Sequence, residues 1–305
     1  MRLSSQDMWT GARSVALSRR VPFEVRCRLL YLYRRRSWAT RYPVTFTQKL
    51  LWKMVKDRRP LLTTFADKVA VRDYVAHAVG PEVLPQLYAV VTDPSDLDPA
   101  QLPEQFVVKP NNASGLVWIV ADQSVGRAHL ESGMFTTRQE LDWDVLVATC
   151  RAWLALDYAD VALEWAYRNI PPKIMVEELL LNSVGQIPRD YKFLVFHGRV
   201  RLIQVHTDRF SDHRVNLFLP DWTPFYAQLP FPRANHEPPR PDSLERMVQI
   251  AETLGQETDF VRVDLYDVDG RVVFGEVTSY PAAASQDLYP ESLELGQYWT
   301  LPLHY

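Results

Sequence analysis

The first fifth of the chain repeats its apolar residues at steps of three and four positions, and this spacing predicts helices. The repeating positions within residues 6–59 include Leu29, Leu30, Tyr33, Leu50, Leu51 and Met54. Pro22, Pro43 and Pro60 interrupt this run, so we expect several short helices rather than one long one. A further helix is expected over residues 67–79.

Short apolar runs bounded by turn residues predict strands, which dominate the chain from Gln105 onward. The expected strands cover residues 87–91, 106–109, 116–121, 173–181, 190–196, 201–206, 260–266 and 272–277. Helices are expected over residues 144–153 and 242–254. Asp269-Gly270 lies between the last two strands and predicts a tight hairpin turn. Helices first and mixed sheets afterwards indicate an α+β protein of several lobes.

Composition is that of an ordinary globular protein, with 305 residues, 47% of them hydrophobic, and a net charge of -3. Such a chain is not built to neutralise a polyanion. Cys27 and Cys150 have no metal-binding or redox spacing, so we expect no disulfide and a reducing compartment. No apolar run approaches the roughly 20 residues of a membrane span, and Met1–Leu17 does not read as a signal peptide. We therefore expect a cytoplasmic protein.

Basic residues outnumber acidic ones between Arg13 and Arg59, and Arg34, Arg35 and Arg36 are consecutive. A solvated helical face is one interpretation of this run. A docking surface for an anionic partner, such as a polysaccharide, a carrier or a membrane headgroup layer, is the other. No nucleic-acid-binding motif accompanies the run, so nucleic acid is not an expected partner.

The last predicted hairpin carries the most informative polar residues. Residues two apart on a strand point the same way, so Arg262 and Asp264 share a face, as do Glu276 and Thr278. The turn at 267–270 can bring Asp264 and Glu276 together, and paired carboxylates suit Mg²⁺ held with phosphate oxygens. The alternative is a solvent-exposed strand face with ordinary polar alternation.

Two other segments offer groups to a nucleotide. Lys109 ends an apolar strand and precedes the polar, small-residue turn 111–115, an arrangement suited to phosphates or simply to a surface lysine. The apolar strand 174–180 contains Glu177-Glu178 and can offer backbone groups to an adenine edge, or it can be an edge strand. The sequence contains neither a P-loop nor a G-x-G-x-x-G motif after a strand.

In this order, these segments resemble the TupA-like branch of the ATP-grasp superfamily. The resemblance runs from about Pro43 to Leu295, and its segments are 43–49, 66–75, 84–88, 105–109, 190–193, 203–210, 260–266 and 275–278. It implies the ATP-grasp fold, in which mixed and antiparallel sheets form two lobes that grip a nucleotide. It also implies four regions: a helical N-terminal region (1–60), a pre-ATP-grasp region (61–104), a lid lobe (105–172) and a catalytic core lobe (173–305).

The resemblance also implies a role for each candidate residue, with ATP and Mg²⁺ as cofactors. Lys109 would contact the ATP phosphates, together with the loop that contains Ser114. Glu177, Glu178, Leu179 and Leu180 would line the adenine pocket, and Asp190 would reach the ribose. Asp264, Glu276 and Thr278 would hold Mg²⁺, while Arg262 and Lys192 would be catalytic. Arg209 and His206 are candidates for the substrate site.

Two segments depart from the family pattern. The loop after Lys109 contains fewer glycines than expected, which predicts a stiffer cover over the phosphates. The segment 279–284 is likewise free of glycine where a substrate-facing turn is expected. Thr278 stands where the superfamily often has asparagine.

The implied activity is that of an ATP-dependent carboxylate–amine ligase, which forms an acyl phosphate and couples it to an amine or amino acid. Its setting would be cell-surface polymer or secondary-metabolite synthesis. A kinase-like or hydroxyl-acylating enzyme and a non-catalytic scaffold protein on the same fold remain open alternatives.

Overall fold

The computed structural model describes residues 20–35, 42–122, 133–207, 213–227, 231–284 and 293–302. Some features expected from the sequence lie outside these ranges. They include the helix predicted before residue 20, Arg36 of the basic run and the candidate substrate residue Arg209.

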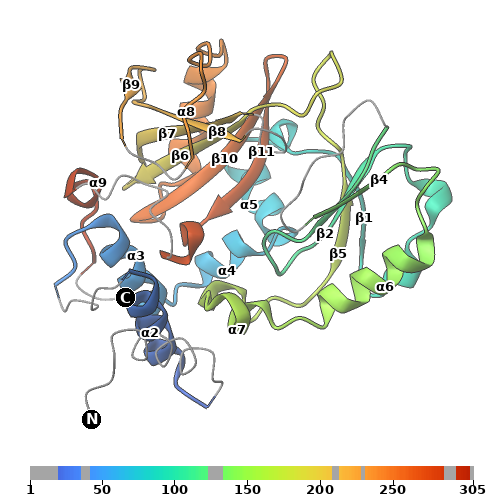
Figure 1. The fold of residues 1–305 in the computed structure, drawn as a ribbon, viewed down its shortest axis with the longest axis horizontal. Coiled ribbons are helices and arrows are strands. Elements are labelled where there is room, and N and C mark those ends of the chain that lie inside the picture. Colours follow the sequence, from blue (N-terminus) through green and yellow to red (C-terminus); the bar gives the residue numbers. More distant parts are fainter. Residues whose placement is uncertain are drawn as a thin grey trace.

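A five-stranded sheet forms the smaller lobe (Figure 1). In spatial order its strands are β1 (Leu87–Val91), β5 (Ile174–Glu177), β2 (Phe106–Pro110), β3 (Val117–Val120) and β4 (Gly133–Thr136). All neighbours pair antiparallel except β3 and β4, which run parallel. Helix α6 (Trp143–Leu154) packs Leu146 and Cys150 into the apolar core of this lobe.

A six-stranded antiparallel sheet forms the larger lobe. Its order is β11 (Arg271–Thr278), β10 (Phe260–Val268), β6 (Asp190–Phe196), β7 (Arg199–Thr207), β8 (Arg214–Phe218) and β9 (Pro224–Phe225). Helices α5 (Ala70–Val79) and α8 (Leu244–Leu254) cover one face, where Phe193, Val263 and Met247 are fully buried.

The opposite face of this sheet is divided into an apolar and a polar half. Phe196 and Phe260 in the apolar half pack against Phe46 of α3 (Phe46–Lys56) and against Trp299. Buried polar side chains occupy the other half, where the strands approach the smaller lobe. Polar groups withdrawn from water need partners, so this half of the sheet marks the candidate site.

Four α-helices precede β1 in the described part of the chain. They are α2 (Phe23–Arg35), α3, α4 (Pro60–Ala66) and α5. Thr45 and Gln48 form a capping box that starts α3. Lys53 of α3 is fully buried and contacts Asp259 at 2.6 Å and Asp57 at 3.2 Å, so it ties α3 to the residue before β10.

The elements with a strong hydrophobic pattern form where the sequence predicted them. Each strand predicted from Leu87 to Val277 is present, and Asp269 and Gly270 both adopt positive φ in the turn between β10 and β11. The pattern did not predict α4 (Pro60–Ala66), β4, β8, β9, α7 (Tyr158–Ala162), the helical turn η5 (Trp165–Tyr167) or α9 (Leu293–Gln297). These are short elements with no full period of apolar residues.

The regional division at 1–60, 61–104, 105–172 and 173–305 stays a prediction. The five-stranded sheet draws strands from the last three of these regions. Within the described ranges, no helix is long and apolar enough to cross a membrane. Cys27 and Cys150 are buried free thiols.

Candidate active site

A bulge at Gly275 sets the geometry of the last hairpin. From the turn, Leu265 pairs with Phe274, but the next pair is Asp264 with Glu276, so Gly275 is the extra residue. Without the bulge, Glu276 would face the opposite side of the sheet, because one residue of slip reverses every side chain. A Cβ at position 275 would lie 3.1 Å from the Asp264 carbonyl oxygen and 2.9 Å from the Tyr266 ring. Glycine therefore permits the close approach that brings the two carboxylates together.

Arg262 connects these carboxylates. Its Nε donates to Asp264 Oδ1 at 2.6 Å, and its Nη2 donates to Asp264 Oδ2 at 2.7 Å and to Glu276 Oε1 at 2.5 Å. Thr278 Oγ1 donates to Glu276 Oε1 at 3.0 Å. The two predicted pairs on this strand face, Arg262 with Asp264 and Glu276 with Thr278, thus form one hydrogen-bonded cluster.

Lys192 extends the cluster onto β6. It pairs with Asp264 in the strand register and forms ion pairs with Asp264 and, at 2.6 Å, with Asp190. Asp190, Lys192 and Asp264 are each at most 5% exposed. Buried charges at this density are stable only when each has an opposite charge in contact.

The two carboxylates of the hairpin have different electrostatic environments. Burial raises the pKa of Asp264, although Arg262 and Lys192 oppose the effect. Burial also acts on Glu276, but Arg262, followed by Lys192 and Lys68, outweighs it and holds the Glu276 pKa well below its ordinary value. The Glu276 side chain remains 36% exposed, so an ionised carboxylate is presented to the cleft.

The larger sheet forms one wall of the site, and residues from the smaller lobe form most of the opposite wall. Lys109 of β2 forms an ion pair with Glu177 of β5, and Arg72 of α5 lies 3.8 Å from the same carboxylate. Arg72 Nη2 also donates to the Pro85 carbonyl oxygen at 2.7 Å. Lys109 and Glu177, predicted from separate segments, therefore meet at one place.

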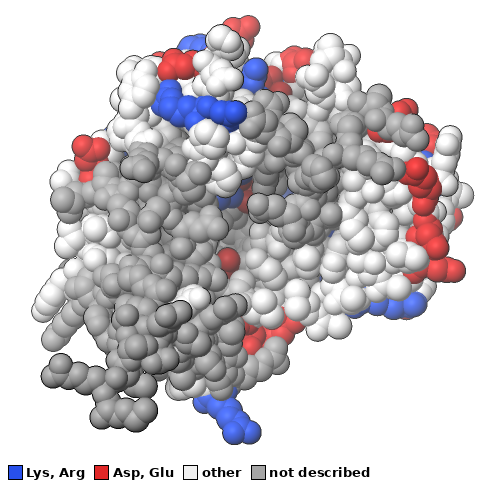
Figure 2. Space-filling view, in the orientation of Figure 1, with Lys and Arg blue, Asp and Glu red and all other residues white. Residues whose placement is uncertain are grey.

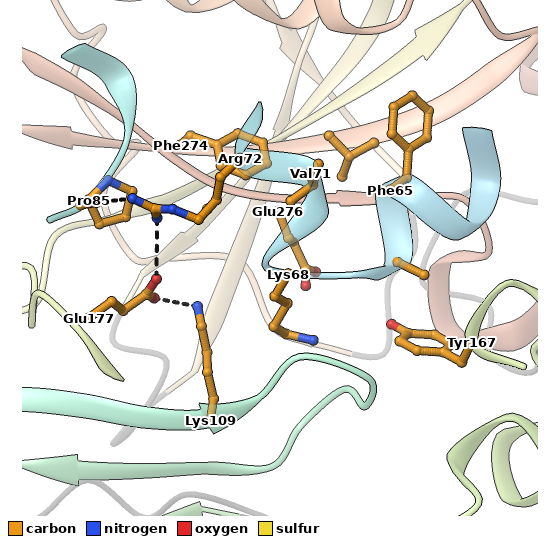
Figure 3. Close-up of a pocket in the computed structure, with 13 residues that line it drawn as sticks. Phe65, Lys68, Val71, Arg72, Pro85, Lys109, Tyr167, Glu177, Phe274 and Glu276 are labelled. Carbon is orange, nitrogen blue, oxygen red and sulfur yellow. Dashed lines mark hydrogen bonds and ion pairs between the residues drawn. The ribbon is translucent and has the colours of Figure 1, made fainter. Parts of the chain in front are cut away.

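A cleft lies between the two walls. Figure 3 shows Lys109, Glu177 and Arg72 at one end, Tyr167 at the other, and Lys68 and Glu276 between them. Phe65, Val71 and Phe274 add apolar surface to the lining. On the face drawn in Figure 2, charged side chains of both signs are visible across the described surface rather than one sign alone. The cleft combines apolar contact area with a few convergent charges, as small-molecule sites do.

Lys68 belongs to the cleft but received no role from the sequence. It lies between α4 and α5, and its Nζ donates to the Ala113 carbonyl oxygen. Burial lowers the pKa of Lys68 to about 8, opposed first by Glu276. Its segment, 66–75, was part of the family resemblance, which was the one signal that could have identified it.

The loop after Lys109 is anchored to the protein. Asn111 is fully buried: its Nδ2 donates to Asp67 Oδ1 at 2.9 Å and its Oδ1 accepts from the Lys173 backbone N–H at 2.7 Å. The exposed Ser114 is hydrogen-bonded by Tyr158. These bonds anchor the loop, and its stiffness stays a prediction.

The segment after β11 reaches left-handed conformations without glycine. Ala282 and Ala283 have φ of 51° and 47°. Alanine rarely adopts such values, so the surrounding structure must hold this turn in place.

Other predicted residues lie further from the cleft. Glu178 points away from Lys109, since Arg271 Nη2 donates to it at 2.8 Å and the Gln86 backbone N–H at 3.0 Å. Leu179 and Leu180 are half-buried in the connection that follows β5. His206 pairs with Asp190 in the strand register, and its Nδ1 lies 2.9 Å from His213 Nε2.

Part of the basic N-terminal run has a structural role. Arg26 is 3% exposed and binds Asp160 through its side-chain and backbone oxygens. It is therefore not available at the surface to an external anion.

The donor set of the hairpin fits Mg²⁺ in part. Asp264 and Glu276 face each other, and the Thr278 hydroxyl adjoins Glu276, which gives hard oxygen atoms of the kind Mg²⁺ prefers. In the described part of the chain, no group of three or more His, Cys, Asp or Glu side chains is placed to hold a metal by itself. Such a set suits an ion that completes its shell with phosphate oxygens and water.

The family model for TupA-like ATP-grasp proteins matches residues 48–299, well over half of the chain. The chain belongs to the TupA-like ATP-grasp family. The family predicted from the sequence is thereby confirmed, and so is the ATP-grasp fold with its two sheets.

Solved ATP-grasp ligases resemble this family member only distantly. D-alanine–D-alanine ligase from Bacillus anthracis, complexed with ATP, is 17% identical, with a TM-score of 0.41 over 72% of this chain and 56% of the other. L-amino acid ligase from Bacillus licheniformis is 16% identical, with a TM-score of 0.42 over 75% and 47%. PsnB, complexed with a phosphomimetic precursor variant, Mg and ADP, is 12% identical, with a TM-score of 0.42 over 78% and 58%.

In each case the chain spans less than two thirds of the other protein's length. No curated protein sequence gives a significant match to this chain.

Proposed function

We propose that this protein is an ATP- and Mg²⁺-dependent ligase that activates a carboxylate as an acyl phosphate and couples it to an amine. The observation that carries the proposal is the contact of Arg262 with both Asp264 and Glu276 beside a cleft lined by Lys68 and Lys109. Catalysis of phosphoryl transfer rests mainly on positioning and on neutralising charge, which is what such a set of cations supplies.

The residues divide into three groups under this proposal. Lys109 and Lys68 bind the ATP phosphates, Glu177 and the backbone of Leu179 and Leu180 border the adenine, and Asp190 lies toward the ribose. Asp264 and Glu276, with the Thr278 hydroxyl, would hold Mg²⁺, which neutralises phosphate charge when bound.

Arg262 and Lys192 complete the mechanism by stabilising charge on the transferring phosphoryl group. Both residues are more than 90% buried, and carboxylates on neighbouring strand positions hold their side chains. A donor held in place before the reaction stabilises developing charge without having to reorganise. His206 and Arg209 stay proposed substrate contacts.

The proposed setting is the cytoplasm, in amino-acid or peptide attachment during cell-surface polymer or secondary-metabolite synthesis. The carboxylate would be a small molecule or a group on a polymer. Exposed basic residues of the N-terminal region, among them Arg28 and Lys56, would receive an anionic partner.

Hydroxylamine capture tests the proposed reaction. The protein is incubated with ATP, Mg²⁺, hydroxylamine and a panel of amino acids and N-acetyl amino acids, and hydroxamate and ADP are measured. We expect both products in equal amounts with at least one carboxylate. ADP formed with a stable phosphorylated product and no hydroxamate would favour the kinase-like alternative. No turnover with any carboxylate would favour the scaffold.

A further inference from the structure

One residue that lines the cleft has no role in the proposed chemistry. Tyr167 ends η5 and belongs to the segment 158–167, which neither sheet contains and which we call the α7–η5 wall. Figure 3 shows its ring at the end of the cleft away from Lys109 and Glu177. A side chain that lines a small-molecule cleft contacts what the cleft binds, so Tyr167 needs an assignment.

Tyr167 lies beside the group proposed to hold the ATP phosphates. The Lys68 ammonium nitrogen is 5.9 Å from the centre of the Tyr167 ring, and both residues line the cleft with Glu276. The Tyr167 hydroxyl is on the side of the ring that faces Lys68 (Figure 3). The hydroxyl is therefore directed toward the place where phosphoryl transfer is proposed.

This hydroxyl is available as a hydrogen-bond donor. Within the described part of the chain, no residue forms a hydrogen bond with it, whereas the hydroxyl of the neighbouring Tyr158 bonds to Ser114. Burial raises the pKa of Tyr167 well above its ordinary value of 10, so the oxygen keeps its proton at neutral pH. A protonated hydroxyl in this position can donate to an anion that enters the cleft.

The backbone of the α7–η5 wall is held in an uncommon conformation. Leu163, four residues before Tyr167, has φ 58° and ψ 36° and is 1% exposed. A leucine in the left-handed region is strained, and such strain persists only where the surroundings fix it. The Cys27 thiol of α2 provides one support, since it donates to the Leu163 carbonyl oxygen at 3.7 Å.

The residues on both sides of Tyr167 are held by the N-terminal helices. The Arg58 guanidinium, just after α3, lies 5.0 Å from the centre of a Trp165 ring. The Arg168 guanidinium lies 4.9 Å from the centre of the Phe23 ring at the start of α2. Tyr167 is thus fixed by contacts before and after it, as a binding residue requires.

The order of groups along the cleft indicates which anion meets Tyr167. Under the proposed function, the adenine borders Glu177, and the phosphates extend along Lys109 and Lys68. The attacking and leaving oxygens of a phosphoryl transfer lie roughly in line with the phosphorus. The carboxylate must therefore approach the γ-phosphate from the side away from the adenine, which is the end of the cleft that Tyr167 occupies.

We infer that Tyr167 marks the carboxylate subsite, where its hydroxyl donates a hydrogen bond to one oxygen of the substrate carboxylate and directs the other toward the γ-phosphorus. This inference rests on the proposed ligase function. It places the carboxylate substrate against the α7–η5 wall, within reach of the positive charge of Lys68.

The step that this contact serves is balanced without a proton transfer. The free carboxylate oxygen forms a bond to the γ-phosphorus, and the bond from that phosphorus to the β,γ-bridging oxygen breaks. ADP leaves with the electron pair, and the acyl phosphate carries the transferred group. Tyr167 keeps its proton throughout, because its role is to orient the carboxylate.

Removal of one oxygen atom tests the inference. Tyr167→Phe keeps the ring, and with it the edge-to-face contact at 4.8 Å with Tyr158, so the variant should fold as wild type does. Tyr226 is 73% exposed, and Tyr226→Phe is the matched control.

All three proteins are assayed with Mg²⁺, ATP, hydroxylamine and the amino acid or N-acetyl amino acid that gives wild type the most hydroxamate. The kcat and the KM for each of the three substrates are measured separately. Titration calorimetry measures binding of a non-hydrolysable ATP analogue with Mg²⁺, and circular dichroism checks the fold.

We expect kcat/KM for the carboxylate to fall by about 10- to 100-fold in Tyr167→Phe, the usual effect of losing a hydrogen bond to a charged group. The KM for hydroxylamine and the affinity for the ATP analogue should stay within about twofold of wild type. Tyr226→Phe should match wild type in every measurement.

Three results from a folded Tyr167→Phe would overturn the inference. An unchanged kcat/KM for the carboxylate would remove Tyr167 from the substrate site. Weaker binding of the ATP analogue with an unchanged KM for the carboxylate would assign the hydroxyl to the γ-phosphate. A rise confined to the KM for hydroxylamine would assign it to the amine. Absence of hydroxamate from wild type would instead reject the ligase function, and the carboxylate subsite with it.

Discussion

Two walls of one cleft place glutamates in opposite electrostatic conditions. On the sheet wall, Glu276 contacts the Arg262 guanidinium at 2.5 Å, and its pKa is held well below the ordinary value. On the α7–η5 wall, Glu164 has no such contact in the described ranges, and burial raises its pKa to about 8. The same side chain is thus held as an anion on one wall and shifted toward its neutral form on the other.

The difference teaches how the setting of a side chain decides its charge. On the sheet, strand register keeps opposite charges in contact, which holds the carboxylates ionised. In a connection between helices, a buried carboxyl without such a contact is shifted toward its neutral form.

Replacing Arg262 should have the largest effect on activity of all the changes proposed for the sheet wall. Arg262→Ala leaves Asp264 and Glu276 facing each other without the guanidinium, so ADP formation in the hydroxylamine assay should fall by about 100- to 1,000-fold. The exposed Arg199, at 70% exposure, offers the matched control Arg199→Ala. A rate within threefold of wild type for Arg262→Ala would show that the sheet wall is not the reaction centre.

Filling the bulge should have a smaller effect on the same wall. Gly275→Ala places a Cβ within 3.1 Å of the Asp264 carbonyl oxygen, so β11 must shift and Glu276 must move relative to Asp264. We expect ADP formation to drop about tenfold, in the range that misplacement of a catalytic group causes. Circular dichroism checks that the variant is folded, and full activity in a folded variant would contradict the role given to the bulge.

Two variants that replace a glutamate by the uncharged glutamine should test the opposite charge states through their thermal stability. The folded pKa of Glu164 is raised, so its contribution to stability is complete below pH 4.5 and is lost as pH rises through about 8. Glu164→Gln should therefore raise Tm relative to wild type, and more so at pH 8.5 than at pH 5.5.

Glu276→Gln should behave in the opposite sense. The folded pKa of Glu276 is lowered, so its contribution is present above pH 4.5 and lost as the pH falls below that value. This variant should lower Tm at pH 7, by about 2–4 °C for each kcal/mol lost. Thermal scans at both pH values measure the two effects, and shifts of the same sign in both variants would refute the opposed charge states.

The sheet wall could be predicted from the sequence, whereas the α7–η5 wall could not. Alternation along a strand identifies which residues share a face, so Arg262, Asp264, Glu276 and Thr278 were found before the fold was known. Their register also depends on the bulge, which an isolated glycine in a strand suggests but does not prove.

Glu164 and Lys68 lie in connections between helices, where no period relates neighbouring side chains. Their approach to Glu276 is set by the packing of α2, α3 and α4, which join parts of the chain more than 100 residues apart. Local pattern carries no information about such contacts. The same limit explains why Glu178 was grouped with Glu177, although Glu178 binds Arg271 on the other side of the connection.

Binding of a non-hydrolysable ATP analogue, with and without Mg²⁺, tests most directly that this cleft is a nucleotide site. Titration calorimetry compares wild type with the double variant Asp264→Ala, Glu276→Ala. We predict micromolar binding by wild type that requires Mg²⁺ and weakens at least tenfold in the double variant. A folded wild-type protein that binds no analogue at millimolar concentration, or binds it equally in both proteins, would contradict the account.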